Sequence, residues 1–118
     1  MRIHIVLGDQ TLSATLNGSA AAKAFADQLP LELQLDDYHG IEKIADLPER
    51  LPTSGSPAGM DPDVGDITYY APWGNLAIFY RDFGYASGLI HLGRIDGSMD
   101  DLSVKGSLLV RIERADGN

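Results

Sequence analysis

Apolar side chains recur at every second position in short segments along most of this chain. The pattern occupies residues 3–7 and returns in residues 12–16, on the far side of a turn at residues 8–10. Side chains of a β-strand point alternately to opposite faces, so this spacing is typical of strands with one buried face. The first sixteen residues therefore predict a β-hairpin.

The same alternation returns further along the chain, where Gly, Pro and Asp residues separate the segments. In one segment, residues 19–29, the apolar residues recur at helical spacing instead. Capping side chains precede this segment and Pro30 ends it, so we expect a short helix. We expect its Phe25 to plug one end of the fold. The later predicted strands cover residues 31–35, with a break at 37–40, a short piece at 41–45, and then 67–71, 76–80, 89–95 and 106–114.

About eight short strands and one short helix predict a mainly β fold. A closed eight-stranded antiparallel barrel is favoured, because closure leaves no strand edge exposed, and a β-sandwich is the alternative. The 118 residues suffice for one closed core and are too few for two, so we expect a single domain over residues 1–118. The tail, residues 115–118, should fray.

A long loop is predicted between the two halves of this pattern. Residues 47–65 contain four prolines and three glycines, a density that is incompatible with a regular element. Loops longer than about 12–15 residues are usually functional or disordered in compact domains. This loop is therefore either a flap beside a site or a mobile excursion.

The charge balance and the absence of cysteine restrict the partners and the chemistry. With 17 Asp and Glu residues against 9 Lys and Arg residues, the net charge of −8 would repel a phosphate backbone, so we expect no nucleic-acid partner. Without cysteine, neither a disulfide nor a thiolate nucleophile can form. No stretch approaches the roughly 20 apolar residues of a membrane span, so we expect a cytoplasmic protein without a membrane partner.

The aromatic side chains gather between residues 69 and 85, and they are too many for the interior of one small barrel. An exposed aromatic cluster with a few polar anchors would suit a peptide or an apolar small molecule, and closing the barrel end is the alternative role for these rings. Trp73 leads the set, since a Pro-Trp-Gly corner disfavours full burial while the indole N–H can bind a ligand. The predicted ligand-binding residues are Tyr70, Trp73, Asn75, Phe79, Arg81, His91 and Arg94.

The sequence predicts neither a metal site nor a cofactor. Asp36, Asp37 and His39 could share a divalent ion, but neighbouring strand residues point to opposite faces, which favours a solvated turn. A general-base role for His91 is not favoured, because no nucleophile lies near it in the sequence. The glycines punctuate turns and form no phosphate-binding loop.

Two segments carry a family resemblance. Residues 65–80 read Gly-Asp-Ile-Thr-Tyr-Tyr-Ala-Pro-Trp-Gly-Asn-Leu-Ala-Ile-Phe-Tyr, and residues 88–97 read Gly-Leu-Ile-His-Leu-Gly-Arg-Ile-Asp-Gly. Together they resemble the compact bacterial cyclophilin-like proteins. The resemblance implies the eight-stranded cyclophilin barrel, with a capping helix whose Phe sits inside the barrel mouth.

The resemblance implies the family's fold, but it does not imply the reaction of active cyclophilins, peptidyl-prolyl isomerisation. Active cyclophilins carry a Phe-His-Arg-Ile…Phe motif and a Gln-Phe-Phe strand. Residues 38–52 contain no such Arg motif, and Leu76 stands where the resemblance would put the glutamine. Isomerisation must lower a barrier of about 18–20 kcal/mol, helped by a donor to the prolyl nitrogen, and that donor is missing here.

Three functional hypotheses remain. The leading one is a cyclophilin-like barrel that binds a small ligand or a peptide segment at its aromatic site without efficient isomerase catalysis. The first alternative is a peptidyl-prolyl isomerase with a non-standard site, in which Arg50, Arg81 or Arg94 supplies the donor. The second is a protein–protein interaction module, which includes pairing of two copies as a homo-oligomer.

Overall fold

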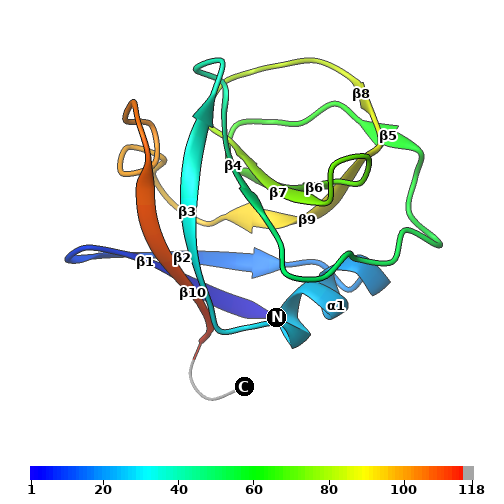
Figure 1. Ribbon diagram of the computed structural model, residues 1–118, viewed down its shortest axis with the longest axis horizontal. Helices are drawn as coiled ribbons and strands as arrows, with labels where there is room; N and C mark the ends of the chain where they lie inside the picture. The colour runs from blue at the N-terminus through cyan, green and yellow to red at the C-terminus, as the bar shows by residue number, and fades with distance from the viewer. Residues whose placement is uncertain (116–118) are drawn as a thin grey trace.

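The strands close into an antiparallel barrel, which confirms the predicted fold class. The computed structural model describes residues 1–115. Around the barrel the strands follow the order β1-β10-β3-β4-β7-β6-β9-β2, and β5 and β8 form a separate two-stranded sheet beside it (Figure 1). The strands are β1 Arg2–Leu7, β2 Gln10–Leu16, β3 Leu31–Tyr38, β4 Glu42–Asp46, β5 Gly59–Met60, β6 Asp66–Tyr70, β7 Asn75–Phe79, β8 Ala86–Ser87, β9 Leu89–Ile95 and β10 Leu108–Arg114.

The helix α1, Ala20–Asp27, lies across one end of the barrel (Figure 1). Ser19 caps its N-terminus, because the hydroxyl oxygen accepts a hydrogen bond of 3.1 Å from the N–H of Ala22. Phe25 is fully buried in the main core, where the inward side chains of the strands meet. The expected plug is therefore confirmed, and the helix is slightly shorter than the 19–29 segment that the spacing predicted.

The third strand runs further than its sequence pattern indicated. Asp37 and Tyr38 pair with Lys43 and Glu42 of β4, so the break expected at 37–40 begins only after Tyr38. The polar side chain of Asp37 does not end the strand, because it accepts hydrogen bonds from the Tyr80 hydroxyl and from the N–H of Gly40. A residue with internal partners is tolerated in a strand where the sequence alone indicates a turn.

The long loop packs against the barrel. Leu51 is buried, and its N–H donates a hydrogen bond of 3.1 Å to the hydroxyl of the buried Tyr69. The loop also contains β5, which pairs with β8. Residues 47–65 thus lack long regular structure, as predicted, and hydrogen bonds attach them to the barrel at several points.

The end of the described chain is held in place. Ala115 is buried, and its N–H donates to the carbonyl oxygen of Arg2 at 3.2 Å, so the expectation of fraying is wrong for this residue. The rest of the predicted frayed tail, residues 116–118, lies outside the described residues. No helix in residues 1–115 has the length and hydropathy required to span a membrane.

Candidate functional site

A second apolar cluster lies on the outer face of the barrel. The inward side chains of β6 and β7 fill the main core, but Tyr70 of β6 and Ala77 and Phe79 of β7 place apolar side chains on the outer face. Ala77, Phe79 and Leu89 are buried there, although none of them belongs to the interior cluster. Outward apolar side chains on a solvated strand need a cover, and here the chain after β7 supplies it by folding back as β8.

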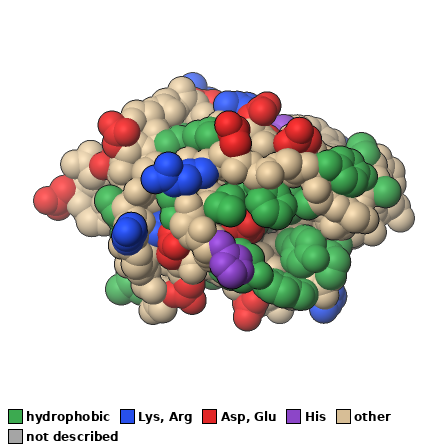
Figure 2. Space-filling view, turned by 90° about the horizontal axis from the view of Figure 1, so that it is seen from above, with side chains coloured by type: hydrophobic (Ala, Val, Ile, Leu, Met, Phe, Trp, Pro, Cys, Tyr) green, Lys and Arg blue, Asp and Glu red, His purple; other side chains and the backbone are tan. Residues whose placement is uncertain are grey.

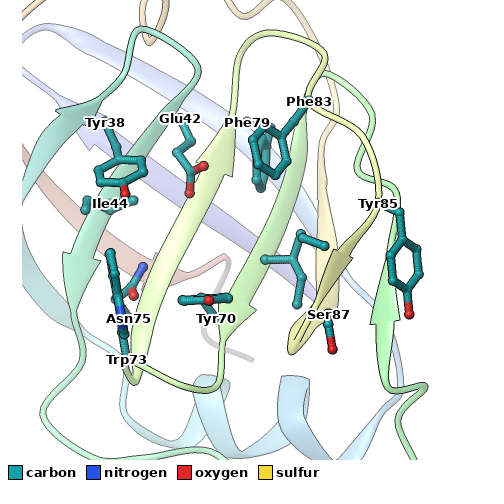
Figure 3. A pocket seen from close by; sticks show the side chains of 12 residues that line it. Tyr38, Glu42, Ile44, Tyr70, Trp73, Asn75, Phe79, Phe83, Tyr85 and Ser87 are labelled. Atoms are coloured by element: carbon teal, nitrogen blue, oxygen red, sulfur yellow. The ribbon is translucent and has the colours of Figure 1, made fainter.

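A pocket of about 450 Å³ lies between this outer face and the folded-back segment. Its volume falls in the range of about 300–1,000 Å³ that is usual for small-molecule sites. Four of the seven predicted binding residues line it, namely Tyr70, Trp73, Asn75 and Phe79. The other lining residues are Tyr38, Glu42, Ile44, Phe83, Tyr85, Ala86, Ser87 and Leu89 (Figure 3).

Aromatic rings form two walls of the pocket. The Trp73 ring stands almost perpendicular to Tyr38 and to Tyr70, with centroid separations of 5.8 and 5.4 Å. On the other side, Phe79 and Phe83 lie 5.9 Å apart. The two edge-to-face contacts of Trp73 each contribute about 0.5–1.5 kcal/mol, so they help to position this wall of the pocket.

The corner at residues 71–74 positions Trp73. The N–H groups of Trp73 and Gly74 both donate to the carbonyl oxygen of Tyr70, and Gly74 adopts a φ of +71° that favours glycine. Pro72 packs directly on Gly88, where an added Cβ would lie 2.8 Å from the proline ring. This contact joins the corner to the folded-back segment, so two walls of the pocket are fixed to each other.

Three aromatic side chains at the pocket reach solvent. Trp73 is 56% exposed, Phe83 52% and Tyr85 66%. From the side shown in Figure 2, hydrophobic side chains reach the surface in several patches among acidic ones. The expectation that some of the aromatic side chains lie outside the barrel is confirmed, because the pocket is built on its outer wall.

Glu42 points into the middle of the aromatic walls (Figure 3). In the register of β4 it pairs with Tyr38 on one side and with Phe79 on the other. Its carboxylate makes no hydrogen bond or ion pair within residues 1–115. Burial without a compensating partner raises the pKa of Glu42 to about 7, so protonated and ionised forms coexist near neutral pH.

Asn75 places a second unpaired acceptor at the pocket. Its amide nitrogen donates to the carbonyl oxygen of Leu76 at 2.9 Å, and the side chain is only 3% exposed. Its Oδ1 has no hydrogen-bond partner within the described chain. A buried acceptor left unpaired is destabilising, and such groups are uncommon in folded proteins outside functional sites.

The remaining three predicted binding residues do not line the pocket. His91 and Arg94 lie beside Asp66, whose Oδ1 is 2.9 Å from Arg94 Nη1 and 3.4 Å from His91 Nε2. Arg94 also donates to the carbonyl oxygen of Val64 and thereby attaches the end of the long loop. Arg81 is exposed, with its guanidinium 5.9 Å from the centroid of the Tyr80 ring.

The residues considered for a metal are separated, as the strand alternation indicated. Asp36 accepts hydrogen bonds from Gln34 and Ser107, and these bonds lower its pKa. Asp37 faces the other way and bonds Tyr80, and this hydrogen bond is the main cause of its lowered pKa. Within residues 1–115 no three His, Asp or Glu side chains come together as a metal site.

One buried cation was not predicted from the sequence. Lys43 is completely buried, and its Nζ donates to the carbonyl oxygens of Val104 and Gly106 and lies 3.3 Å from Asp37. The ammonium group thereby holds the segment before β10 against β4. Tyr38 and Glu42 were missed as well, although both flank the turn at 39–40 and a hairpin pairing would have placed them side by side.

Comparisons with known proteins agree with the resemblance seen in the sequence. A family model described as a cyclophilin-like family matches residues 5–113. The solution structure of a hypothetical protein from Archaeoglobus fulgidus is similar, with a TM-score of 0.70 and 21% sequence identity over 98% of this chain and 95% of that chain. At this identity the likeness shows a shared fold. No curated protein sequence matches significantly.

Proposed function

Since this chain belongs to the cyclophilin-like family, we propose that its barrel serves as a binding protein for a small ligand or a peptide segment. The ligand occupies the aromatic pocket on the outer face of β4, β7, β6 and β9. The observation that carries the proposal is a pocket of about 450 Å³ with mostly apolar walls and two unpaired acceptors, the Glu42 carboxylate and Oδ1 of Asn75. Apolar walls with a few unpaired polar groups are the usual composition of ligand sites.

Efficient isomerase catalysis is not part of this proposal, because no cationic side chain lines the pocket. Each arginine considered as a substitute donor has another contact. Arg50 donates to the carbonyl oxygen of Ala71, Arg94 is ion-paired with Asp66, and Arg81 lies over Tyr80. A donor to the prolyl nitrogen would have to come from outside the lining residues.

A thermal-shift screen with proline peptides and a panel of metabolites tests the proposal. A ligand should raise the melting temperature of the native protein, since binding to the folded state alone stabilises it. Trp73→Ala should remove the shift, whereas Leu109→Ala, which truncates another exposed apolar side chain away from the pocket, should keep it. Equal responses of the two variants, or no response of the native protein to any compound, would refute ligand binding in this pocket.

A second candidate is docking of a partner chain, including a second copy, onto the same rings. The exposed fractions of Trp73, Phe83 and Tyr85 favour it, because large exposed aromatic side chains often mark interfaces. Light scattering over a concentration series distinguishes the two candidates. If the mass of the native protein doubles with rising concentration while the Trp73→Ala variant stays monomeric, docking of a second copy is supported.

A further inference from the structure

The pocket carries charge of one sign, which is negative. Among its twelve lining residues Glu42 is the only one with an acidic or basic side chain, and the chain as a whole carries a net charge of −8. An anionic ligand would meet a carboxylate and no Lys, Arg or His. A neutral ligand would leave the ionised form of Glu42 enclosed without a counter-charge, which is unfavourable. A cationic ligand is therefore the one that complements the ionised form of Glu42.

The aromatic walls have the same preference. The Trp73 ring stands almost perpendicular to the rings of Tyr38 and Tyr70, and the three rings lie near the Glu42 side chain (Figure 3). The faces of these rings are electron-rich, and they attract a cation within about 6 Å of the centroid. A quaternary ammonium group needs no hydrogen-bond acceptor, and a protonated amine could use the unpaired Oδ1 of Asn75. Rings and carboxylate thus favour a positive nitrogen carried on an apolar body.

We propose that the pocket binds an organic ammonium ion, whose nitrogen lies beside the Glu42 carboxylate and against the rings of Tyr38, Tyr70 and Trp73. This inference rests on the proposed ligand-binding function and names the ligand class. The site is the outer pocket, and the partly exposed rings form its entrance. Binding of the cation holds Glu42 in its ionised form.

The groups around Glu42 allow its charge to control binding. Its β4 neighbour Lys43 points into the barrel and is held there with Asp37 of β3, so neither faces the pocket. The other titratable groups among the residues that line the pocket are the phenols of Tyr38, Tyr70 and Tyr85. On the remaining flanking segments, His39 packs against the Tyr38 ring, and Arg81 and Asp82 are exposed and do not line the pocket.

The test compares choline with 3,3-dimethylbutan-1-ol, in which a neutral carbon replaces the charged nitrogen. Trp73 is the only tryptophan, so its fluorescence reports on the pocket. We expect choline to bind about tenfold more tightly than the alcohol near pH 8, because only choline gains the charge and ring attractions. Since the charge of choline does not change with pH, its affinity should fall as the pH drops below about 7, where Glu42 of the free protein takes up a proton.

Two variants identify the source of the discrimination. Glu42→Gln should bring the two affinities to within about twofold and abolish the pH dependence. Glu32→Gln removes the same charge from an exposed position outside the pocket, and it should keep the tenfold preference. A peptide with trimethyllysine presents the same group from a protein chain, and tighter binding of choline than of this peptide identifies a free ligand.

The outcomes separate this inference from the proposed function. Equal affinity of the native protein for choline and the alcohol would overturn the ammonium assignment while leaving an apolar ligand site. An undiminished, about tenfold preference for choline in Glu42→Gln would equally overturn the role given to the carboxylate. If neither compound bound and the wider panel of peptides and metabolites also failed, the pocket would not be a ligand site at all.

Discussion

At the scale of single residues, Glu42 and Lys43 are neighbours in β4 that meet opposite surroundings. The side chain of Glu42 points outward into an apolar pocket without a partner, while Lys43 points inward and is saturated with acceptors. Alternation along a strand explains the opposite directions. The partners explain why one charge stabilises the fold and the other destabilises it.

Replacing Glu42 should make the protein more stable at high pH. The folded protein binds the Glu42 proton more tightly than the unfolded chain, so the resulting stability is present below about pH 4.5 and is lost as the pH rises through about 7. Glu42→Gln has no proton to lose. We expect similar unfolding free energies for variant and native protein at low pH, and an advantage of about 1 kcal/mol for the variant near pH 8, discounted for solvent access. Urea unfolding at both pH values measures this, and a destabilised variant near pH 8 would contradict it.

Replacing Lys43 should have the opposite effect. Lys43→Met keeps an apolar stem but leaves the carbonyl oxygens of Val104 and Gly106 and the carboxylate of Asp37 without their donor. Removing one member of a buried charged network costs about 3–5 kcal/mol. Lys23→Met, at an exposed position of α1, is the control and should change the unfolding free energy by less than about 0.5 kcal/mol. Equal stabilities of the two variants would refute a structural role for Lys43.

Sequence patterns predicted whether most side chains point into or out of the barrel. They did not predict which side chains from distant segments these would contact. The positions of Tyr70, Trp73, Asn75 and Phe79 in one pocket follow from a short hairpin that the sequence makes visible. Glu42 was out of reach, because its place in the pocket depends on β4 pairing with β7 across the long loop. His91 and Arg94 share the outer wall with the pocket, but their contacts with Asp66 are set by the pairing of β6 with β9.

At the scale of elements, the pairing of β2 with β9 depends on one glycine. Gly93 has an ordinary extended conformation, yet a Cβ at this position would lie 2.2 Å from the carbonyl oxygen of Thr15. The requirement for glycine is therefore steric and comes from a backbone that belongs to a distant part of the sequence. A sequence pattern identifies Gly93 as a break in the alternation but not as the point of close approach.

The Gly93→Ala variant should be destabilised by about 3 kcal/mol, because the added methyl group pushes two paired strands apart. Gly97→Ala is the matched control, since nothing lies within 4 Å of its added Cβ. We expect the control to stay within about 0.5 kcal/mol of the native protein. Thermal or urea unfolding of both variants measures the difference, and a Gly93→Ala variant as stable as the control would show that the strands are not packed this closely.

Elements with strong local signals were predicted well. The hairpin of β1 and β2, the capped helix and the hairpin of β6 and β7 each depend on contacts within about 20 residues. The exceptions are the two short strands β5 and β8, each of two residues, which exist only because they pair with each other. Such strands carry no periodicity of their own, so only the tertiary structure shows them.

At the scale of the whole molecule, closure of the barrel buries one face of each of its eight strands and leaves the outer wall free for a site. The cyclophilin-like family membership accounts for the barrel, and the site depends on the side chains of this chain. Under the function proposed above, the outer pocket binds a ligand and does not catalyse the reaction associated with the fold.

Isomerase activity should therefore be absent. In a chromogenic X-Pro peptide assay we expect the cis-to-trans rate to equal that of the spontaneous isomerisation, which takes tens to hundreds of seconds. The physical reason is the lack of a cationic donor among the residues that line the pocket. Acceleration that Arg50→Ala or Arg81→Ala reduces would show that one of these side chains reaches the substrate, and would replace binding by catalysis as the function.

The most direct test of the central claim is the location of bound ligand on the protein. In a nuclear magnetic resonance titration with choline, we expect the amide shifts to concentrate in β4, β7 and residues 83–89, together with the indole N–H of Trp73. The signals of Asp66 and Arg94, on the same wall but outside the pocket, should change little. Shifts centred on Asp66 and Arg94, or scattered over the surface, would contradict the assignment of the aromatic pocket as the binding site.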